Sequence, residues 1–448
     1  MSDERTTPYR RSGDPIRGLR VEVLEGPDRG QTQEASSETL TIGSAPGNDL
    51  VLTDTTVSRY HVELRRDGDR ILVEDHSSTN GTVAGGVTIQ RATIAPGTVL
   101  TLGRTQIRVA DGHIVDLEAI DEDNLGPLRG RAPEMRTLMA RIRRVAQAGA
   151  SVLVLGETGS GKELIARALH EESPRKDAPF ETVDCGTLMP TLVASELFGH
   201  EKGAFTGAER QHIGAFERAS GGTIFLDEIG ELPRDLQATL LGVLERRVMR
   251  RVGGSKTIPV DVRVVAATHR DLRAEVNAGT FRQDLYYRLG VVLLRVPPLR
   301  ARPGDIPLLV EHFLRDAGYN GNVDDLIPPE AMATLKTYHW PGNVRELRNF
   351  VESAMALGET PNLEQSSESA AAPSASSGFP SVSLETLYKR AYKDARAFVL
   401  SEFERLYLSA LLERTAGNVS RAARESDINR THLIQMLKRH PVDRHRGP

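Results

Sequence analysis

SVLVLGETGSGKELIARALHEE, residues 151–172, decides the fold of the middle of this chain. An apolar run that predicts a buried strand leads into the glycine-rich stretch Gly156–Lys162 and then into a helical pattern. The glycines let backbone N–H groups close around phosphates, and Lys162 would neutralise the outer phosphates. A chance glycine turn before a helix is the alternative, but the flanking strand and helix favour a phosphate-binding loop.

The residue after the lysine departs from the general pattern of such loops. Glu163 stands where a Ser or Thr hydroxyl would normally ligate Mg²⁺, so the metal must use other oxygens. In GGTIFLDE an apolar run ends in Asp227 and Glu228, and ligands bind at this carboxyl edge of a parallel sheet. We expect Asp227 to hold Mg²⁺ and Glu228 to polarise the water that attacks the γ-phosphate. A helix-capping Asp is the alternative interpretation.

Further apolar runs extend this pattern into a parallel sheet sandwiched by helices. Strands that are buried on both faces read as continuous apolar stretches; here they are SVLVLG, FETVDC, TIFLD, VRVVAAT and VVLLRVP. The fourth ends in Thr268, a polar group placed to sense the γ-phosphate. Downstream, FRQDLYYRL presents Arg282 and Arg288, which would either stabilise a phosphoryl group from a neighbouring subunit or form surface salt bridges.

The composition is that of a soluble multidomain protein. With 448 residues, 39% hydrophobic and 26% charged, the chain is long enough for about two to four domains. No apolar run approaches the roughly 18 residues of a membrane span. A single cysteine excludes an internal disulfide framework, so we expect a cytoplasmic protein with no membrane partner. The net charge of −4 hides a basic end, since residues 414–448 hold eight Lys/Arg against three Asp/Glu, which indicates nucleic acid.

Residues from about 127 to 360 resemble the AAA+ domain of bacterial enhancer-binding proteins, the activators of sigma-54 RNA polymerase. The matching segments stand in the family's order; they are GETGSGKE, ELFGHEKGAFTGA, GGTIFLDEI, ATHRDL, FRQDLYYRL and WPGNVRELRN. An acidic residue after the lysine is usual in this family, so Glu163 fits it. The resemblance implies an ATPase that uses ATP and Mg²⁺ in a ring, expected to be a hexamer, with Arg282 and Arg288 acting in trans.

The same resemblance assigns the remaining residues of the ATPase. Arg345 becomes the lid arginine that reports nucleotide state, and Asp184 takes the place of an Asn that often couples Glu228 to a moving loop. Trp340, as an aromatic residue, is expected in the core. The nucleotide-binding set is Gly156, Glu157, Thr158, Gly159, Ser160, Gly161, Lys162, Glu163, Thr268 and Arg345.

GAFTGA would be the loop tip that ATP turnover moves against sigma-54. Its residues are Gly203, Ala204, Phe205, Thr206, Gly207 and Ala208. The glycines allow motion, an exposed Phe205 offers apolar area, and Thr206 offers a hydroxyl. An uncommitted surface loop would not explain this composition.

Before the ATPase, residues 18–114 show short β-type runs broken by Gly, Asp and Asn, which predict a β-sandwich or barrel. TIGSAPGNDLVL, TTVSRYH and HSSTNGT resemble a forkhead-associated domain, a β-sandwich that reads phosphothreonine through loops at one end. The phosphopeptide-binding positions are Ser58, Arg59, Thr79 and Asn80, whose hydroxyl, guanidinium and amide groups are suitable phosphate donors.

One residue of this pattern is unusual. Ser44 follows Gly43 where the family usually has Arg, which should weaken phosphate binding by roughly 1.5–3 kcal/mol unless Arg59 substitutes. The expected partner is a phosphothreonine-containing protein or a Ser/Thr kinase, and a phospho-independent interaction module is the alternative.

The tail resembles the Fis-type helix-turn-helix domain that ends enhancer-binding proteins. Asn418 is placed to cap one helix, and a second helix, from about Arg430 to His440, would enter the major groove of upstream enhancer DNA. The DNA-binding residues are then Arg430, Thr431, His432 and Gln435 toward bases, with Lys438 and Arg439 toward phosphates. A helical oligomerisation tail is the alternative.

These assignments divide the chain into seven segments. They are a disordered N-terminus (1–15), a forkhead-associated β-sandwich (16–114), a linker (115–126), an α/β AAA+ subdomain (127–298), its helical lid (299–360), a Ser/Ala-rich linker (361–383) and an all-α helix-turn-helix domain (384–448). The sequence thus predicts a three-part activator of sigma-54 polymerase. Two other functions stay open: an AAA+ remodeller of a different substrate, and a phosphopeptide-binding adaptor with an inert ATPase.

Overall fold

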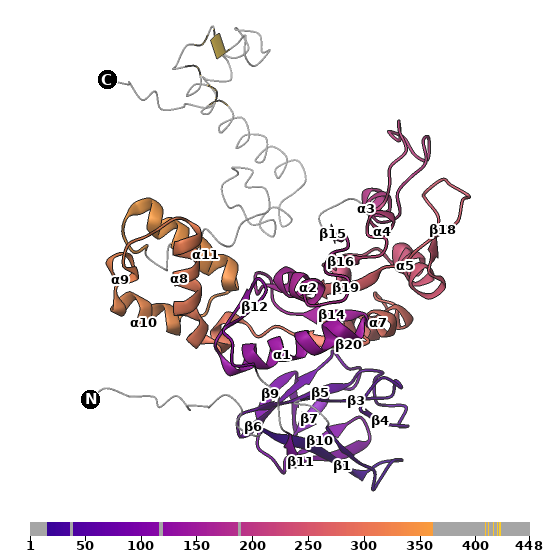
Figure 1. Ribbon diagram of the computed structural model, residues 1–448. Coiled ribbons are helices and arrows are strands. Elements are labelled where there is room, and N and C mark those ends of the chain that lie inside the picture. Colours follow the sequence, from indigo (N-terminus) through magenta and orange to yellow (C-terminus); the bar gives the residue numbers. More distant parts are fainter. Residues whose placement is uncertain are drawn as a thin grey trace. The chain divides into compact units, whose positions relative to one another are not determined.

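The computed structural model describes residues 16–35, 39–115, 120–186 and 190–361, with the isolated positions 408, 411, 415, 419, 421 and 422 (Figure 1). Residues 1–361 and 362–448 form two separate compact units. Within the first unit we call residues 16–115 the head, 120–298 the central domain and 299–361 the lid. The predicted disordered N-terminus, the Ser/Ala-rich linker and the helix-turn-helix domain lie almost entirely outside the described residues.

The head is a β-sandwich, as its short strand patterns predict. One sheet has the order β2-β1-β11-β10-β7-β8 and the other β4-β3-β5-β6-β9. The strands are β1 (Ile16–Glu25), β2 (Thr32–Glu34), β3 (Thr39–Gly43), β4 (Leu50–Val51), β5 (Val62–Asp67), β6 (Arg70–Asp75), β7 (Thr82–Ala84), β8 (Val87–Ile89), β9 (Arg91–Ile94), β10 (Val99–Leu102) and β11 (Thr105–Val115). Alternate residues such as Leu19, Val21 and Val23 of β1 face one buried core.

The central domain is built on a five-stranded parallel sheet with the order β15-β16-β19-β14-β20. These strands are β14 (Val152–Leu155), β15 (Phe180–Asp184), β16 (Thr223–Asp227), β19 (Arg263–Thr268) and β20 (Val292–Arg295). Its helices are α1 (Pro133–Ala148), α2 (Lys162–Glu171), α3 (Pro190–Phe198), α4 (Ala215–Arg218), the 3-10 turn η1 (Ile229–Glu231), α5 (Arg234–Arg246), α6 (Leu272–Ala278) and α7 (Gln283–Leu289). A small hairpin, β17 (Val248–Met249) and β18 (Ile258–Pro259), follows α5.

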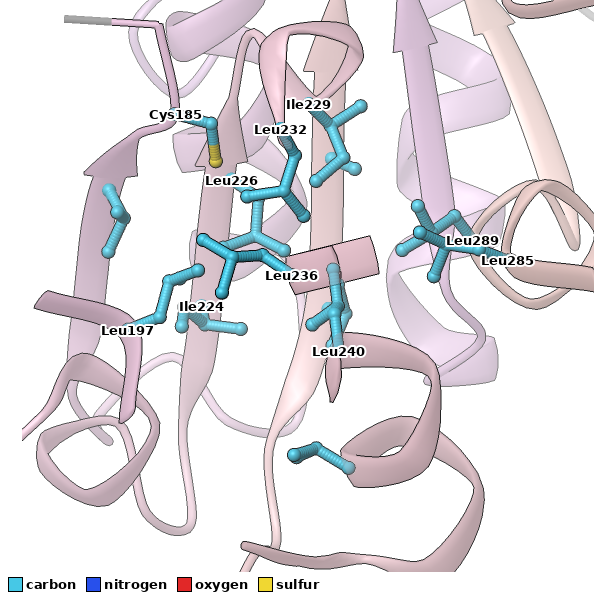
Figure 2. Close-up of a cluster of buried hydrophobic side chains, with 14 of the residues drawn as sticks. Cys185, Leu197, Ile224, Leu226, Ile229, Leu232, Leu236, Leu240, Leu285 and Leu289 are labelled. Carbon is cyan, nitrogen blue, oxygen red and sulfur yellow. The ribbon is translucent and has the colours of Figure 1, made fainter. Parts of the chain in front are cut away.

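Helices cover both faces of this sheet. The strands are continuously apolar because their side chains are buried on both faces. Val152 and Val154 of β14 pack with α1 and α2, while Leu153 points to the opposite face. On that face the buried side chains of η1, α5 and α7 gather around the strands (Figure 2). Cys185 lies in this cluster, where burial raises the pKa of its thiol to about 12.

The central domain begins earlier than the sequence predicts. Residues 120–126 were expected to be linker, yet β12 (Asn124–Leu125) pairs with β13 (Leu128–Arg129), and both leucines are buried with α1 and α2. Ile120 packs against the same cluster. Two apolar residues in an otherwise acidic segment gave too weak a pattern to predict this contribution to the core.

The lid is helical. It comprises η2 (Leu299–Ala301), η3 (Pro303–Asp305), α8 (Ile306–Asp316), α9 (Val323–Leu326), α10 (Pro329–Thr337) and α11 (Asn343–Leu357). Trp340 is fully buried in it, as predicted for a core residue, with its indole N–H donating to the carbonyl of Leu335 at 2.8 Å. None of the helices in the described ranges has the length and apolarity needed to cross a membrane.

Candidate active site

The phosphate-binding loop joins the end of β14 to the start of α2. Gly159 and Gly161 have φ angles of 76° and 106°, which residues with a side chain rarely adopt. The Lys162 side chain is only 6% exposed, and its ammonium donates to the carbonyl oxygen of Gly156 at 3.1 Å. The loop therefore places a buried positive charge beside the N-terminus of a helix, where anions bind.

The predicted acidic pair lies directly opposite this lysine. Glu228 Oε1 is 3.2 Å from Lys162 Nζ, and Glu228 Oε2 is 2.7 Å from His269 Nδ1. Glu228 has a left-handed φ of 48°, a strained conformation for a residue other than glycine, of the kind found at functional sites. Asp227 pairs in register with Asp184 of the neighbouring strand. Three strand ends thus bring their polar groups to one edge of the sheet.

The two carboxyl groups of the pair differ in their electrostatics. Burial raises the pKa of Asp227, and the nearby charges of Glu228 and Asp184 add to this effect. Burial would also raise the pKa of Glu228, but the hydrogen bond from His269 and the charge of Lys162 outweigh it, so this pKa is lowered. Glu228 is therefore ionised at neutral pH and can accept a hydrogen bond from water.

Thr268, which was expected to sense the γ-phosphate, is buried and already hydrogen-bonded within its own chain. Its side chain is fully buried at the end of β19, and its hydroxyl accepts a hydrogen bond from the backbone N–H of Arg270 at 3.1 Å. The next residue, His269, is the one that contacts Glu228.

The lid contacts the phosphate-binding loop through hydrogen bonds that the sequence analysis did not predict. Glu157 accepts from Arg300 at 2.7 Å and from the Asn343 side chain at 3.1 Å, and the hydrogen bond from Arg300 lowers the pKa of Glu157. The backbone N–H groups of Val344 and Arg345 donate to the carbonyl of Gly159. Arg345 itself is exposed at the start of α11, beside this junction.

Asn343 is the centre of this junction, and its replacement has a calculable cost. Its side chain accepts from the N–H of Leu299 at 2.8 Å and donates to Glu157 and to the carbonyl of Thr158, while its φ is 53°. Three lost hydrogen bonds of about 1 kcal/mol each, and left-handed strain of roughly 1 kcal/mol, predict that Asn343→Ala lowers the free energy of unfolding by about 2–4 kcal/mol.

Trp340 is the single tryptophan of the chain, so its fluorescence during urea unfolding reports this loss for the lid. Asn343→Gly should recover about 1 kcal/mol, because glycine tolerates the left-handed φ. Asn349→Ala, an exposed change on the same helix, should leave the midpoint unchanged. An Asn343→Ala midpoint equal to that of the parent would contradict the proposed junction.

The two candidate arginine fingers lie at the ends of α7. Arg282 pairs with Asp284 at 2.7 Å, and Arg288 donates to the carbonyl of Leu244 at 2.9 Å. Neither guanidinium has a contact with residues 156–162 among the interactions of the described residues. Within one chain they are surface groups.

The GAFTGA segment projects from the central domain beside the β17–β18 hairpin (Figure 1). A backbone bridge joins His200 to His212, and Val252 of the hairpin exchanges hydrogen bonds with Gly199 and Glu201. Arg251 fixes the base of both loops, since it pairs with Glu201 and with Glu217.

At the tip, Phe205 departs from the expectation that it is exposed. It is half-buried because its ring packs edge-on against His200, with the centroids 4.9 Å apart. Thr206 is exposed, and Gly203 and Gly207 on either side have left-handed φ values of 82° and 99°. The base of the segment is thus anchored while the hydroxyl of Thr206 faces solvent.

The head brings its four candidate phosphopeptide residues to one end of the sandwich. The Ser58 hydroxyl accepts from the N–H of Thr79 at 2.9 Å, and the Asn80 amide donates to the carbonyl of Thr56 at 2.7 Å. Arg59 is exposed beside them. The DNA-binding candidates of the tail lie outside the described residues: Arg430, Thr431, His432, Gln435, Lys438 and Arg439.

Comparison with known families matches each part of the chain. Residues 128–295 match the sigma-54 interaction domain, residues 300–371 an AAA+ ATPase lid domain, and residues 399–440 the bacterial regulatory proteins of the Fis family. Residues 22–113 match the cytoplasmic domain of an inner membrane component of the type III secretion system (T3SS).

Several transcriptional regulators are similar over most of the chain. ZraR of Escherichia coli K12 is 45% identical over 334 residues, which cover 74% of this chain and 73% of ZraR. GlrR of the same organism is 43% identical over 314 residues, covering 70% of this chain and 68% of GlrR. Among solved structures, NtrX of Brucella abortus with ADP is 36% identical and covers 70% of each chain with a TM-score of 0.48. A phosphothreonine-dependent FHA domain is 33% identical over 21% of this chain and 95% of its own, with a TM-score of 0.19.

The predicted architecture is confirmed in its β-sandwich head, its AAA+ domain with a parallel sheet and a helical lid, and its Fis-type tail. The chain therefore belongs to the family of sigma-54-dependent transcriptional regulators.

Proposed function

We propose that this protein hydrolyses ATP to remodel sigma-54 RNA polymerase at promoters, while its tail holds upstream DNA. The observation that carries the proposal is the position of Glu228, which directly follows β16 and is held ionised between His269 and Lys162 of the phosphate-binding loop. There Lys162 neutralises the outer phosphates and Glu228 orients the attacking water. The GAFTGA segment on the same domain supplies the moving contact.

Asp227 is the residue that would hold Mg²⁺. No three His, Cys, Asp or Glu side chains in the described ranges are grouped so as to bind a metal by themselves, which suits a metal held by one carboxylate together with substrate phosphates. The raised pKa of Asp227 fits a carboxyl group that a cation would stabilise. When bound, the metal would neutralise charge on the phosphate oxygens.

A ring of subunits, most simply a hexamer, would complete the site. Among the described contacts Arg282 pairs with Asp284 and Arg288 with the carbonyl of Leu244, and neither contacts its own loop, so we assign them to the nucleotide of a neighbouring subunit. Arg345, exposed at the junction of lid and loop, would report nucleotide state to the lid.

The head would regulate this activity by binding a phosphothreonine segment. Ser58, Arg59, Thr79 and Asn80 are its donors. A groove of about 280 Å³ lies beside Asn80 and is also lined by Arg104. The exposed Arg104, which the sequence analysis missed, offers a second cation at this end of the sandwich where Ser44 supplies none.

The test is an open-complex assay with sigma-54 polymerase and a sigma-54 promoter. The protein is used at micromolar concentration, because the promoter DNA then needs no upstream binding site to raise the local concentration of the protein. Open complexes should form with ATP and not with a non-hydrolysable analogue. ATP hydrolysis without open complexes would instead support an AAA+ remodeller of another substrate, and absence of hydrolysis would support an inert adaptor.

A further inference from the structure

The head is packed against the central domain through the loops at one end of its sandwich. Tyr60, only 1% exposed, belongs to the same buried cluster as Leu285 and Leu289. Its ring lies 5.4 Å from that of Tyr286 and 6.3 Å from that of Tyr287. Both tyrosines belong to α7, the helix that carries the candidate arginine fingers.

Polar contacts fix the position of this surface. The Asn277 side chain at the end of α6 accepts from the N–H of Tyr60 at 3.3 Å and donates to its carbonyl at 2.6 Å. It also donates to the carbonyl of His76 at 3.0 Å. A third head loop takes part, because the N–H of Gly47 donates to the hydroxyl of Tyr287 at 3.1 Å. One asparagine of the central domain thus holds the backbone of two head loops.

The surface is also rich in charge. Glu63 of the head is 4% exposed and accepts hydrogen bonds from Arg273 and, at 2.6 Å, from Arg295. Burial would raise the pKa of Glu63, but the charges of Arg295 and Arg273 outweigh burial and lower it. His76 Nδ1 lies 2.6 Å from the Asp271 carboxylate, which caps α6. Because the pairs come from both domains, separation would return every charge to water, which suits a reversible interface.

The same loops carry the candidate phosphopeptide residues. Arg59 directly precedes Tyr60, and Thr79 follows His76 by three residues. The hydrogen bond from the Thr79 N–H to Ser58 ties the two loops together. A phosphopeptide that draws Arg59 toward its phosphate must therefore also displace the adjacent Tyr60. The N–H and C=O of Tyr60 both hydrogen-bond to Asn277.

We propose that the head docks on α6 and α7 of its own central domain through the same loops that bind the phosphopeptide, an inference that rests on the proposed phosphothreonine recognition. Peptide binding and this docking then oppose each other. A phosphothreonine peptide would release Tyr286 and Tyr287, and with them the helix that carries Arg282 and Arg288. The input signal would then act on the trans-acting arginines rather than on the nucleotide loop.

The experiment uses the full chain, a fluorescent phosphothreonine peptide library and its unphosphorylated counterpart. Peptide binding is measured by anisotropy, and amide hydrogen exchange of residues 272–289 is measured by mass spectrometry. Phosphopeptide should speed exchange in α6 and α7. Asn277→Ala should speed it without peptide and tighten peptide binding by ~10-fold or more, since each of the three lost hydrogen bonds shifts docking by roughly 2- to 10-fold.

Two further variants separate the possible outcomes. Asn349→Ala, exposed on the lid, should match the parent in both measurements. Arg59→Ala should lose the peptide response and keep the slow exchange of α6 and α7. Phosphopeptide binding that leaves exchange unchanged, with no gain in Asn277→Ala, would overturn the coupling while leaving phosphopeptide recognition intact. Absence of phosphopeptide binding in every variant, Asn277→Ala included, would overturn the proposed recognition and the coupling with it.

Discussion

Glu228→Gln should reduce the rate of ATP hydrolysis by roughly 10²–10⁴-fold while ATP still binds. The amide keeps the shape of the side chain and can still hydrogen-bond to His269, but it cannot accept a proton from the attacking water. Lys162 stays in place to hold the phosphates, because its ammonium also donates to Gly156. A steady-state phosphate-release assay measures the rate, and fluorescence of a labelled nucleotide measures binding.

The matched control for this change is Glu231→Gln. Glu231 lies three residues further along the chain and pairs with Arg270 at 2.6 Å, so the same chemical change is made outside the nucleotide site. This variant should hydrolyse ATP within about twofold of the parent, since the half-buried Glu231–Arg270 pair makes no contact with Lys162 or Glu228 among the described ion pairs. If Glu228→Gln hydrolyses ATP as fast as Glu231→Gln, the catalytic assignment of Glu228 is wrong.

The candidate nucleotide site was the most predictable part of the chain, because its signals are local. The glycines with left-handed φ, the lysine that begins α2 and the acidic pair that ends β16 each lie within a few residues of the strand that positions them. Continuous apolar runs predicted that those strands form a parallel sheet, and the sheet brings their carboxyl ends together. Asp227, Glu228 and Lys162 could therefore be predicted to be neighbours.

Contacts between distant segments were not predictable in this way. The junction of Glu157, Arg300 and Asn343 joins residues 143 and 186 positions apart, and no pattern around Arg300 singles it out. The half-burial of Phe205 depends on His200, whose position depends in turn on pairing with Val252. Composition could indicate an unusual loop, but only tertiary structure shows which side of it is anchored.

The contact between the head and the central domain could not be predicted from the sequence either. Tyr60 directly follows the phosphopeptide candidate Arg59, and it belongs to the buried core of the central domain instead of the core of the head. Its burial comes from α6 and α7, more than two hundred residues away. Asn277 lies in a helix of ordinary composition, so no feature of the sequence marks it as the partner.

Thr206→Ala should weaken the coupling between ATP hydrolysis and promoter opening while leaving the ATPase itself active. Among the described residues the Thr206 hydroxyl has no hydrogen-bond partner, and its side chain is exposed at the loop tip. Removing it therefore costs the isolated protein little, and hydrolysis should stay within about twofold of the parent. Open complexes should fall by about tenfold or more, the effect of losing one hydrogen bond of roughly 1.4 kcal/mol to the polymerase.

Two substitutions make this test specific to the hydroxyl at the tip. Thr206→Ser keeps the hydroxyl and should retain most open complexes, whereas Thr239→Ala removes an exposed hydroxyl from α5 and should behave like the parent. Permanganate reactivity of the promoter measures opening, and phosphate release in the same reaction measures hydrolysis. Parent-like opening by Thr206→Ala would exclude this hydroxyl as the contact. Loss of hydrolysis along with opening would show that the loop supports assembly of the ring, because the nucleotide site within one chain does not include it.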